Sequence, residues 1–511
     1  MGTVEQKRSQ WGSKIGFILA ASGSAIGLGN IVFFPANAYK YGAGAFYLPY
    51  FVALFVVGIP VMVLELGMGR FSGRAFPATL RQVAGRKGEV AGWFGVLNAS
   101  IITMYYITIL GWVVGMLVGS LKDLWHPSAV EAFGLPSGAL SNAMSYFFNM
   151  ITRYDTVVFV AVVWLLNMLI VFWGTKSIEA AVKVFVPLMW IFMLVLIVRG
   201  LTLDNGGQGV YLLFTPDFSV MKDVEVWRGA FSQIFFTLSL GFGIMTTYAS
   251  YLPKDSDDIS NAGSISFMNC SFEFIAGLAI FSLLFTFAIT PKASTLSMMF
   301  FVVPEGIARF PFAVALFGVL FFLLLLFAGL TSSVSLVEAV IAAVLDRFRG
   351  AARKRVSLVV TAVGFCGSVL FAIPTIIDKG LDSNGTLGLS LLDLFDHWVF
   401  GYGLMLCGLL ECVMTGWFFD MDKLLEHING TGSLKLGAKF KALIRYVIPA
   451  IILVILGSNA VKEITGGLYG HDMSLGDLGF LSPASFVGWL GLTIIGALAL
   501  SGKSAGQEVG R

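Results

Sequence analysis

The chain has 511 residues, of which 57% are hydrophobic and only 12% are charged. Soluble domains carry about 25% charged residues, so this composition and the mean hydropathy of +0.85 exclude a soluble globular protein. The net charge of +3 gives no indication of a nucleic-acid partner. The surroundings that this composition predicts are membrane lipid.

Apolar runs of about 20 residues, each long enough to cross a bilayer, recur along the whole chain. Twelve are predicted, near residues 15–37, 45–69, 91–119, 155–173, 178–199, 226–251, 261–289, 313–345, 357–377, 390–419, 443–461 and 482–501. The first run is not expected to be a cleaved signal peptide, because no A-x-A-like site follows it and its polar residues lie in its middle. The loops between the runs are short, so we predict one all-α integral membrane domain over residues 1–511.

Lysine and arginine residues gather in alternate loops. They occupy the N-terminal segment and the loops after spans two, eight and ten: Lys7, Arg8, Lys14, Arg74, Arg81, Arg86, Lys87, Arg347, Arg349, Arg353, Lys354, Arg355, Lys423, Lys435, Lys439 and Lys441. Cytoplasmic loops carry the excess of such cations. We therefore predict a multi-pass protein of a bacterial inner membrane or other plasma membrane, with both termini in the cytoplasm.

Two of the twelve runs contain residues that weaken a helix in its middle. Span one includes SGSAIGLGNIVFFP (residues 22–35), and span six includes FFTLSLGFGIMTTY (residues 235–248). Glycine costs a helix interior about 1 kcal/mol relative to alanine, and an unpaired backbone group in hydrocarbon costs several kcal/mol more. Interrupted spans at corresponding positions of two halves are typical of inverted-repeat transporters, whose freed carbonyls and helix ends bind ions and substrate. Either segment alone is better explained by close helix packing, but the two together favour broken helices.

Spans seven and eight carry further oxygen-bearing side chains. Asn269 and Glu273 lie four residues apart, on one face of a helix, and an ionisable group at membrane depth indicates a functional site. FAGLTSSVSLVEA (residues 327–339) places several hydroxyls in span eight. Oxygen ligands suit a hard cation, although such hydroxyls also bond to the carbonyl four residues earlier.

Enzymatic chemistry is not indicated by the sequence. The chain has no P-loop, no H-E-x-x-H motif and no nucleophile–base spacing. Its four cysteines and four histidines are scattered and show no disulfide framework or metal-ligand spacing. We therefore expect neither an enzyme nor a protein driven directly by ATP.

Three motifs carry a resemblance to a known family. GSAIGLGN with a following F-P, QIFFTLSLGFG and FAGLTSS resemble the neurotransmitter:sodium symporters, and WGSKIGFILA, GAGAFYLPY, ELGMGR and TPDF extend the likeness over nearly the whole chain. The likeness is greatest to bacterial, leucine-transporter-like amino acid transporters. It implies a leucine-transporter-type 5+5 inverted repeat with 12 transmembrane helices, of which helices 1 and 6 are broken. Spans one to five would form the first repeat (15–199), spans six to ten the second (226–419), and two further spans would follow (443–501).

The resemblance also implies a sodium-coupled symporter that imports a neutral, hydrophobic amino acid by alternating access, as a monomer or homo-oligomer. Two Na⁺ ions are expected. The first sodium site would comprise Ala25, Asn30, Thr237 and Asn269, completed by the substrate carboxylate; the second would comprise Gly23, Ile26, Ala328, Thr331 and Ser332. Because the substrate carboxylate is itself a sodium ligand, each of the two ligands should raise the affinity for the other.

For the substrate, the family pattern implies three sets of contacts. The carboxylate would meet the amides of Leu28 and Gly29 and the Tyr106 hydroxyl; the amine would meet the carbonyls of Ala25, Phe236 and Thr237 and the Ser239 hydroxyl; the side chain would meet Ile102, Phe236, Phe242, Ser332 and Leu336. Monoamine-carrying relatives have an aspartate at the position of Gly27. A glycine leaves room for a substrate carboxylate, and the apolar pocket suggests a neutral aliphatic or aromatic side chain.

The resemblance assigns gating and ion-substituting roles to further residues. Closure at the cytoplasmic end would involve Arg8 with Asp346, Trp11 packed beside them, and Tyr251 near Glu338. Without the resemblance, Arg8 is equally an ordinary cytoplasmic cation. Glu273 stands where chloride-independent bacterial members carry a carboxylate, so we expect no chloride requirement.

The sequence departs from the family at the outer gate. The family has an arginine two residues before the proline of span one, paired with an aspartate of span ten; here that position is Phe33, while Asp396 remains. We hypothesise that the outer gate closes with Phe236 and Tyr106, and that Phe33 adds apolar cover. Alternatively, the altered vestibule reflects an unusual substrate.

Other functions remain open at this point. The chain could carry another small zwitterion with sodium, or serve as a substrate sensor or ion channel on the same scaffold. The full sets of oxygen ligands favour transport, because a sensor has less need of two ion sites.

Overall fold

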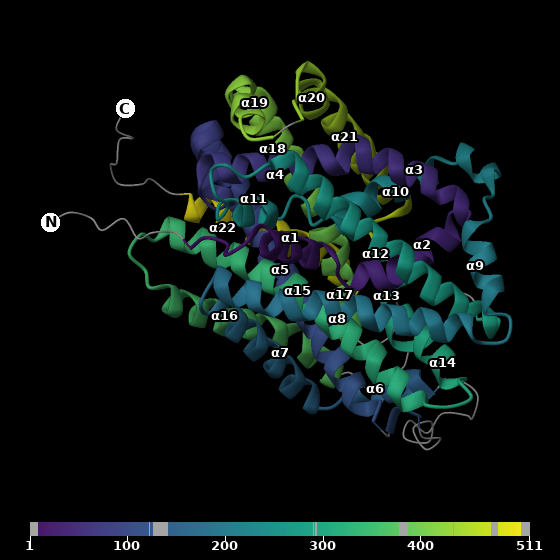
Figure 1. The fold of residues 1–511 in the computed structure, drawn as a ribbon. Helices are drawn as coiled ribbons and strands as arrows, with labels where there is room; N and C mark the ends of the chain where they lie inside the picture. The colour runs from purple at the N-terminus through teal and green to yellow at the C-terminus, as the bar shows by residue number, and fades with distance from the viewer. Residues whose placement is uncertain are drawn as a thin grey trace.

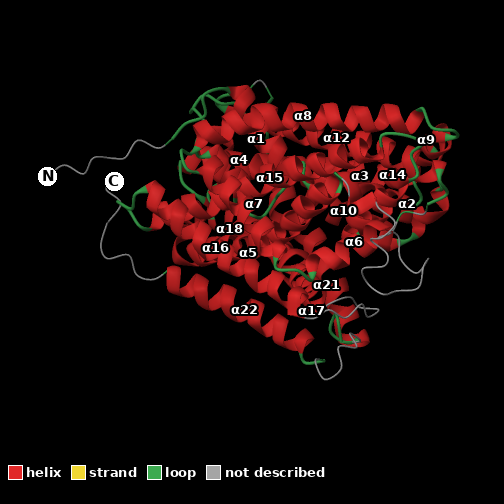
Figure 2. Cartoon of the chain, turned by 90° about the horizontal axis from the view of Figure 1, so that it is seen from below, coloured by secondary structure: helices red, strands yellow, loops and turns green. Residues whose placement is uncertain are grey.

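A computed structural model describes residues 9–121, 123–125, 142–289, 291, 294–377, 387–432, 434–471 and 479–501. These residues form helices and their connections, and the β-type pairing among them is an isolated bridge between Ala43 and Pro216. Figures 1 and 2 show one bundle of helices, in which α1 (Lys14–Ala25) packs against α8 (Thr175–Leu201), α12 (Asp258–Thr286) and α15 (Val314–Arg347). The predicted all-α membrane architecture is confirmed.

The first span is broken at the predicted glycine-rich segment. Helix α1 (Lys14–Ala25) begins after Ser13, whose side chain accepts a hydrogen bond from the Gly16 amide, and it ends where Ile26 becomes extended. The chain continues as a π-helical turn, η1 (Gly29–Phe33), and as α2 (Phe34–Lys40). The two halves of the span are bent by 57°.

The sixth span is also broken where its glycines predict. Helix α10 (Val224–Thr237) is capped by Asp223, and α11 (Ile244–Ala249) follows after six non-helical residues. Within the gap, Ser239, Gly241 and Gly243 have φ values of 55°, 77° and 70°. Glycine adopts this left-handed region without the steric cost that a side chain adds, so the sequence selects this segment for the turn out of the helix.

Every other predicted apolar run contains a helix. In chain order the helices are α3 (Tyr47–Ala53) with α4 (Ile59–Ser72), α5 (Phe76–Gly119), α7 (Asp155–Val171), α8 (Thr175–Leu201), α12 (Asp258–Thr286), α15 (Val314–Arg347), α16 (Arg353–Ile377), α17 (Leu387–Phe395) with α18 (Met405–Phe418), α20 (Ala438–Ala442) with α21 (Ile448–Gly466), and α22 (Leu481–Leu500). Among the described residues, 9 helices are long and apolar enough to cross a membrane, or 11 when each bent pair is one span. The sixth span is not among them, because α10 and α11 are short. The count of twelve therefore stays a prediction.

Several connections contain short helices that the hydrophobic pattern does not reveal. They are α6 (Asn142–Ile151), α9 (Gly206–Phe214), α13 (Thr295–Ser297), α14 (Val303–Ala308) and α19 (Met421–Asn429). In addition, α5 begins at Phe76, well before the predicted run at 91, and it is interrupted by non-helical Ala84 and Gly85. Figure 1 shows α9 beside α12 at one edge of the bundle, and α19 at another edge.

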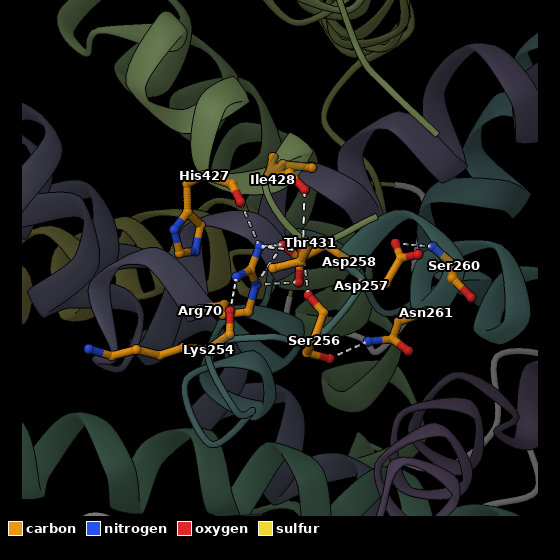
Figure 3. A network of polar contacts seen from close by, with 10 residues as sticks. All are labelled: Arg70, Lys254, Ser256, Asp257, Asp258, Ser260, Asn261, His427, Ile428 and Thr431. Carbon is orange, nitrogen blue, oxygen red and sulfur yellow. Dashed lines mark hydrogen bonds and ion pairs between the residues drawn. The ribbon is translucent and has the colours of Figure 1, made fainter. Parts of the chain in front are cut away.

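A buried ion pair joins α4, α12 and the segment of α19 (Figure 3). Both Arg70 and Asp258 are almost fully inaccessible, and Arg70 Nη2 lies 2.7 Å from Asp258 Oδ2. The Arg70 guanidinium also donates to the carbonyls of Lys254, at 2.6 Å, and His427, at 3.1 Å. A buried charge is tolerated only when it is paired and its hydrogen bonds are satisfied, so this network fixes the three segments relative to one another.

Candidate functional site

The two breaks and α15 meet at the backbone of Ser24. The hydroxyls of Ser239 and Ser332 both donate to the Ser24 carbonyl, at 3.1 Å and 3.0 Å. The Ser24 hydroxyl in turn lies 2.6 Å from the Ser335 hydroxyl. Residues from spans one, six and eight therefore converge in the middle of the bundle, where a broken helix exposes backbone groups.

Three side chains of the predicted first sodium site form a closed set of hydrogen bonds. Asn30 Nδ2 donates to Thr237 Oγ1 and to Asn269 Oδ1, each at 2.8 Å, and Asn269 Nδ2 donates to Thr237 Oγ1 at 3.0 Å. In the alternative orientation of the Asn269 amide, which replaces the two hydrogen bonds of that amide, its nitrogen donates to the Ala25 carbonyl at 3.2 Å and its oxygen accepts from Thr237 Oγ1 at 3.0 Å. All four residues are buried. The structure thus brings together an oxygen-rich set of the kind that a hard cation requires.

A fully buried carboxylate, Glu273, lies directly against this set. It accepts hydrogen bonds from Thr237 Oγ1 at 2.7 Å, from Gln233 Nε2 at 2.8 Å and from the Tyr50 hydroxyl. Among the described residues, the four residues of the set carry no charge of their own. Glu273 therefore places a carboxyl group one hydrogen bond away from the candidate cation position.

The residues of the predicted second sodium site lie where α1 approaches α15. A methyl group added to Gly23 would lie 3.0 Å from Val186 Cγ2 and 3.3 Å from Thr331 Cβ, so glycine permits α1 to lie closely against α8 and α15. The Thr331 hydroxyl donates to the Ala328 carbonyl at 2.9 Å, and the Ser332 hydroxyl lies 3.2 Å from the same oxygen. Ile26, the fifth member, is the extended residue at the end of α1. Its carbonyl is thereby released from the helical pattern.

The predicted carboxylate contacts lie around Gly27 and Gly29. A methyl group on Gly27 would lie 3.0 Å from Ser332 Oγ and 3.4 Å from the Tyr106 hydroxyl, whereas a methyl group on Gly29 would meet no atom within 4 Å. The Tyr106 hydroxyl oxygen is buried beside Leu28 and Ser332. Leu28 and Gly29 begin the second half-helix of span one, and helix N-termini favour anions. The predicted carboxylate contacts are therefore gathered in one place.

The predicted side-chain pocket is apolar. Ile102, Phe242 and Leu336 are buried, and Phe236 is half-buried. Phe236 is stacked on Phe400, with ring centroids 4.3 Å apart. Sequence reasoning missed Phe400, because no periodicity or motif distinguishes it from other apolar residues of span ten.

At the end of the bundle where α1 begins, the predicted gate residues lie in one network with a cation that sequence reasoning missed. The Trp11 indole donates to the Tyr248 carbonyl at 2.9 Å, and Tyr251 donates to Glu338 Oε1 at 2.7 Å. Glu338 also forms an ion pair with Arg353, the first residue of α16. The positive-inside pattern accounts for Arg353 as a loop cation, so nothing in the sequence singles it out.

The other predicted pair at this end is described only in part. Asp346 Oδ2 accepts a hydrogen bond from the Ala75 amide at 2.6 Å, and its other oxygen lies 3.5 Å from Arg74. Arg8 lies outside the described residues. The arginine–aspartate pair predicted for Arg8 therefore stays a prediction.

At the opposite end, the predicted outer-gate residues are not joined to each other. Phe33 is half-buried and makes no ring contact with the described aromatic residues, and no described cation lies within 4.0 Å of Asp396. Polar contacts near this end involve span eleven instead. His397 lies 2.8 Å from Glu463, and Glu225 lies 2.8 Å from Lys462.

Two discontinuous membrane helices that meet at a buried set of oxygen atoms define a secondary transporter, not an enzyme. Comparison with known proteins gives the same class. A model of the sodium:neurotransmitter symporter family matches residues 8–133 and 139–494. The chain belongs to this family, and it is a sodium-dependent symporter.

Individual relatives are similar over most of their length. An uncharacterized sodium-dependent transporter of Methanocaldococcus jannaschii is 38% identical over 503 residues, covering 94% of this chain and 96% of the relative. One of Bacillus subtilis is 33% identical, covering 88% and 97%. The crystal structure of MhsT in complex with L-phenylalanine is 30% identical, has a TM-score of 0.75, and covers 88% of this chain and 99% of that one.

Proposed function

We propose that this symporter imports a neutral, apolar amino acid together with two sodium ions, by alternating access between two repeats at 15–199 and 226–419. The observation that carries the proposal is the approach of the Tyr106 hydroxyl and Ser332 Oγ to Gly27, next to the Asn30–Thr237–Asn269 set. A substrate carboxylate placed there would contact the amides of the second half-helix and the first sodium ion together. The solved relative with bound L-phenylalanine supports an amino acid as the cargo.

A thermal-shift screen of the twenty amino acids, with and without sodium, tests this function. A ligand raises apparent stability by RT ln(1 + [L]/Kd), so about 2.7 kcal/mol is expected at a hundredfold excess over Kd. We expect apolar amino acids to shift the melting temperature only when sodium is present. Shifts by other small zwitterions alone would identify a different cargo.

Sodium-driven accumulation of the identified amino acid in proteoliposomes separates a carrier from a sensor or a channel. A carrier accumulates radiolabel above the outside concentration, and the accumulation saturates and collapses when the sodium gradient is dissipated. Binding without uptake would make the protein a sensor, and sodium leak without accumulation would make it a channel.

We further propose that transport needs no chloride, because Glu273 supplies the negative charge beside the first cation position. Tyr50, Gln233 and Thr237 donate to this carboxylate. Replacing chloride by gluconate should leave uptake unchanged. In Glu273→Ser, uptake should depend on chloride, because the three donors would otherwise lack an acceptor. Strict chloride dependence of the unaltered protein would refute the proposal.

For the ends of the molecule we propose that both termini are cytoplasmic. Trp11, Tyr251, Glu338, Asp346 and Arg8 would then close the cytoplasmic side, and Phe236 with Tyr106 would close the outer side.

A further inference from the structure

The ring of Phe400 contacts both aromatic residues that flank the break in span six. Its centroid lies 4.3 Å from that of Phe236, with an interplanar angle of 29°, and 6.2 Å from that of Phe242. Phe236 belongs to the last turn of α10, and Phe242 lies in the non-helical segment before α11. One side chain of span ten therefore connects two walls of the candidate substrate pocket.

The backbone of span ten accounts for the position of this ring. Phe400 lies in η9 (Asp396–Leu404), a nine-residue π-helical stretch between α17 and α18. A π-helical stretch rotates the following side chains relative to an α-helix, and such stretches are frequent at functional sites. This rotation is consistent with the direction of the Phe400 side chain, which points toward Phe236 of α10.

The same stretch lies against the backbone of the break. A methyl group on Gly241 would come 3.0 Å from the Leu404 carbonyl oxygen and 3.3 Å from the Gly408 amide nitrogen. On its other side, the Gly241 amide donates to Glu65 Oε1 at 2.7 Å. The segment between α10 and α11 thus contacts both α4 and span ten. These contacts fix the position of span ten, and with it Phe400, relative to the break.

Asp396, the aspartate that the family resemblance assigns to the outer gate, forms no ion pair with a described cation. Asp396 lies one turn before Phe400 in the same π-helical stretch, and no cation of the described chain lies within 4.0 Å of it. Phe33 makes no ring contact with the described aromatic residues. Among the described aromatic residues, Phe236 therefore has its ring contact with Phe400.

We propose that Phe400 is a positioning residue that holds Phe236 over the bound amino acid and thereby sets the length of side chain that the pocket accepts. The inference rests on the proposed function. Stacked aromatic pairs contribute beyond simple burial, and loss of that contribution corresponds to an increase of about two- to tenfold in the rate of substrate dissociation. Without the stack, Phe236 is free to rotate, and the pocket should admit longer side chains.

The test compares Phe400→Leu, Phe400→Tyr and a matched control, Phe395→Leu, in the full-length protein. Phe395 is a ring of the same span that contacts Phe371 and not the lid. For the amino acid that stabilises the unaltered protein, dissociation is followed after dilution into sodium buffer. Relative affinities for valine, leucine, phenylalanine and tryptophan are measured by competition.

Phe400→Leu should dissociate its substrate about two- to tenfold faster and shift its preference toward the larger competitors. Phe400→Tyr should restore both properties, because a tyrosine ring keeps the stack, and Phe395→Leu should resemble the unaltered protein. If Phe400→Leu is poorly folded, Phe400→Met tests the same contact with a flexible side chain of similar size.

A folded Phe400→Leu or Phe400→Met with unaltered dissociation and unaltered preference would overturn the inference. Equal changes in Phe395→Leu would also overturn it, because the effect would then reflect general loosening of span ten. Failure of the proposed function is distinguishable: in that case no amino acid stabilises even the unaltered protein.

Discussion

Among single residues, Gly27 is the one that we propose determines which substrates fit. A side chain at this position would extend toward Ser332 Oγ and the Tyr106 hydroxyl, 3.0 Å and 3.4 Å from its Cβ. In Gly27→Asp the new carboxylate would occupy the place proposed for the substrate carboxylate. We expect the affinity for the amino acid to fall at least about a hundredfold, or about 2.7 kcal/mol, as measured by the sodium-dependent thermal shift.

Gly263→Asp is the control for Gly27→Asp. It adds the same charge to α12 at a position where a Cβ meets no atom within 4 Å. An unchanged affinity in Gly27→Asp, or an equal loss in both variants, would contradict the placement of the carboxylate.

His427, in the short helix α19, makes stability depend on pH. Partial burial and the neighbouring Arg70 lower the pKa of His427 from 6.5 to about 4. The unfolded chain therefore binds a proton at His427 in a pH range where the folded chain does not. As the pH falls from about 6.5 to about 4, this residue should make unfolding progressively more favourable.

Melting temperatures measured across this pH range test the role of His427. In His427→Asn the decrease with falling pH should be smaller than in the unaltered protein. His471→Asn is a matched control in an exposed connection. Equal slopes for the unaltered protein and His427→Asn would contradict the assignment.

Among the helices, the Arg70–Asp258 pair determines whether α4, α12 and α19 stay together (Figure 3). Removing one partner of a buried pair leaves an uncompensated charge and costs about 3–5 kcal/mol. We therefore expect Arg70→Gln and Asp258→Asn each to lower the unfolding free energy by about that amount, as measured by denaturant unfolding in detergent. The double variant should lose less than the sum of the two, because neither charge remains unpaired.

The exposed pair Arg309–Glu305 provides the comparison for the buried one. Its side chains are 47% and 37% accessible, and exposed pairs contribute about 0–1 kcal/mol. Arg309→Gln should therefore change stability little. Equal effects of Arg70→Gln and Arg309→Gln would show that the Arg70 network does not hold the helices together.

For the whole molecule, Arg353 connects the beginning of α16 to the network that contains Glu338 and Tyr251. Without the guanidinium, the buried Glu338 carboxylate would be left without a cation. This uncompensated charge would destabilise the packing of the segments that contain Glu338, Tyr251 and Trp11. Arg353→Gln should therefore increase amide hydrogen exchange at the beginning of α1 by about tenfold or more. Arg355→Gln, at an exposed position of the same helix, should not. Unchanged amide exchange in Arg353→Gln would contradict the role of Arg353 in holding the beginning of α1 in place.

The sequence is informative about the parts of this fold that local chemistry determines. Glycines and hydroxyls within apolar runs predict both broken helices, and the family resemblance that they carry is confirmed by the match over residues 8–133 and 139–494. Phe400 and Arg353 were not predicted, because their contacts depend on how spans six, eight, nine and ten pack in three dimensions. The π-helical stretch that directs Phe400 toward Phe236 has no signature in hydrophobic periodicity. The ligand assignments stay predictions, since they come from the resemblance.

The carbonyl of Ser24 has a consequence for how the carrier changes conformation. A carbonyl oxygen has two lone pairs, and here Ser239 and Ser332 occupy one each, at 3.1 Å and 3.0 Å. Withdrawal of this end of α1 must break its bonds to spans six and eight in the same event. A movement away from only one of the two serines would leave one lone pair of this buried oxygen without a donor. We therefore expect this end of α1 to separate from spans six and eight together.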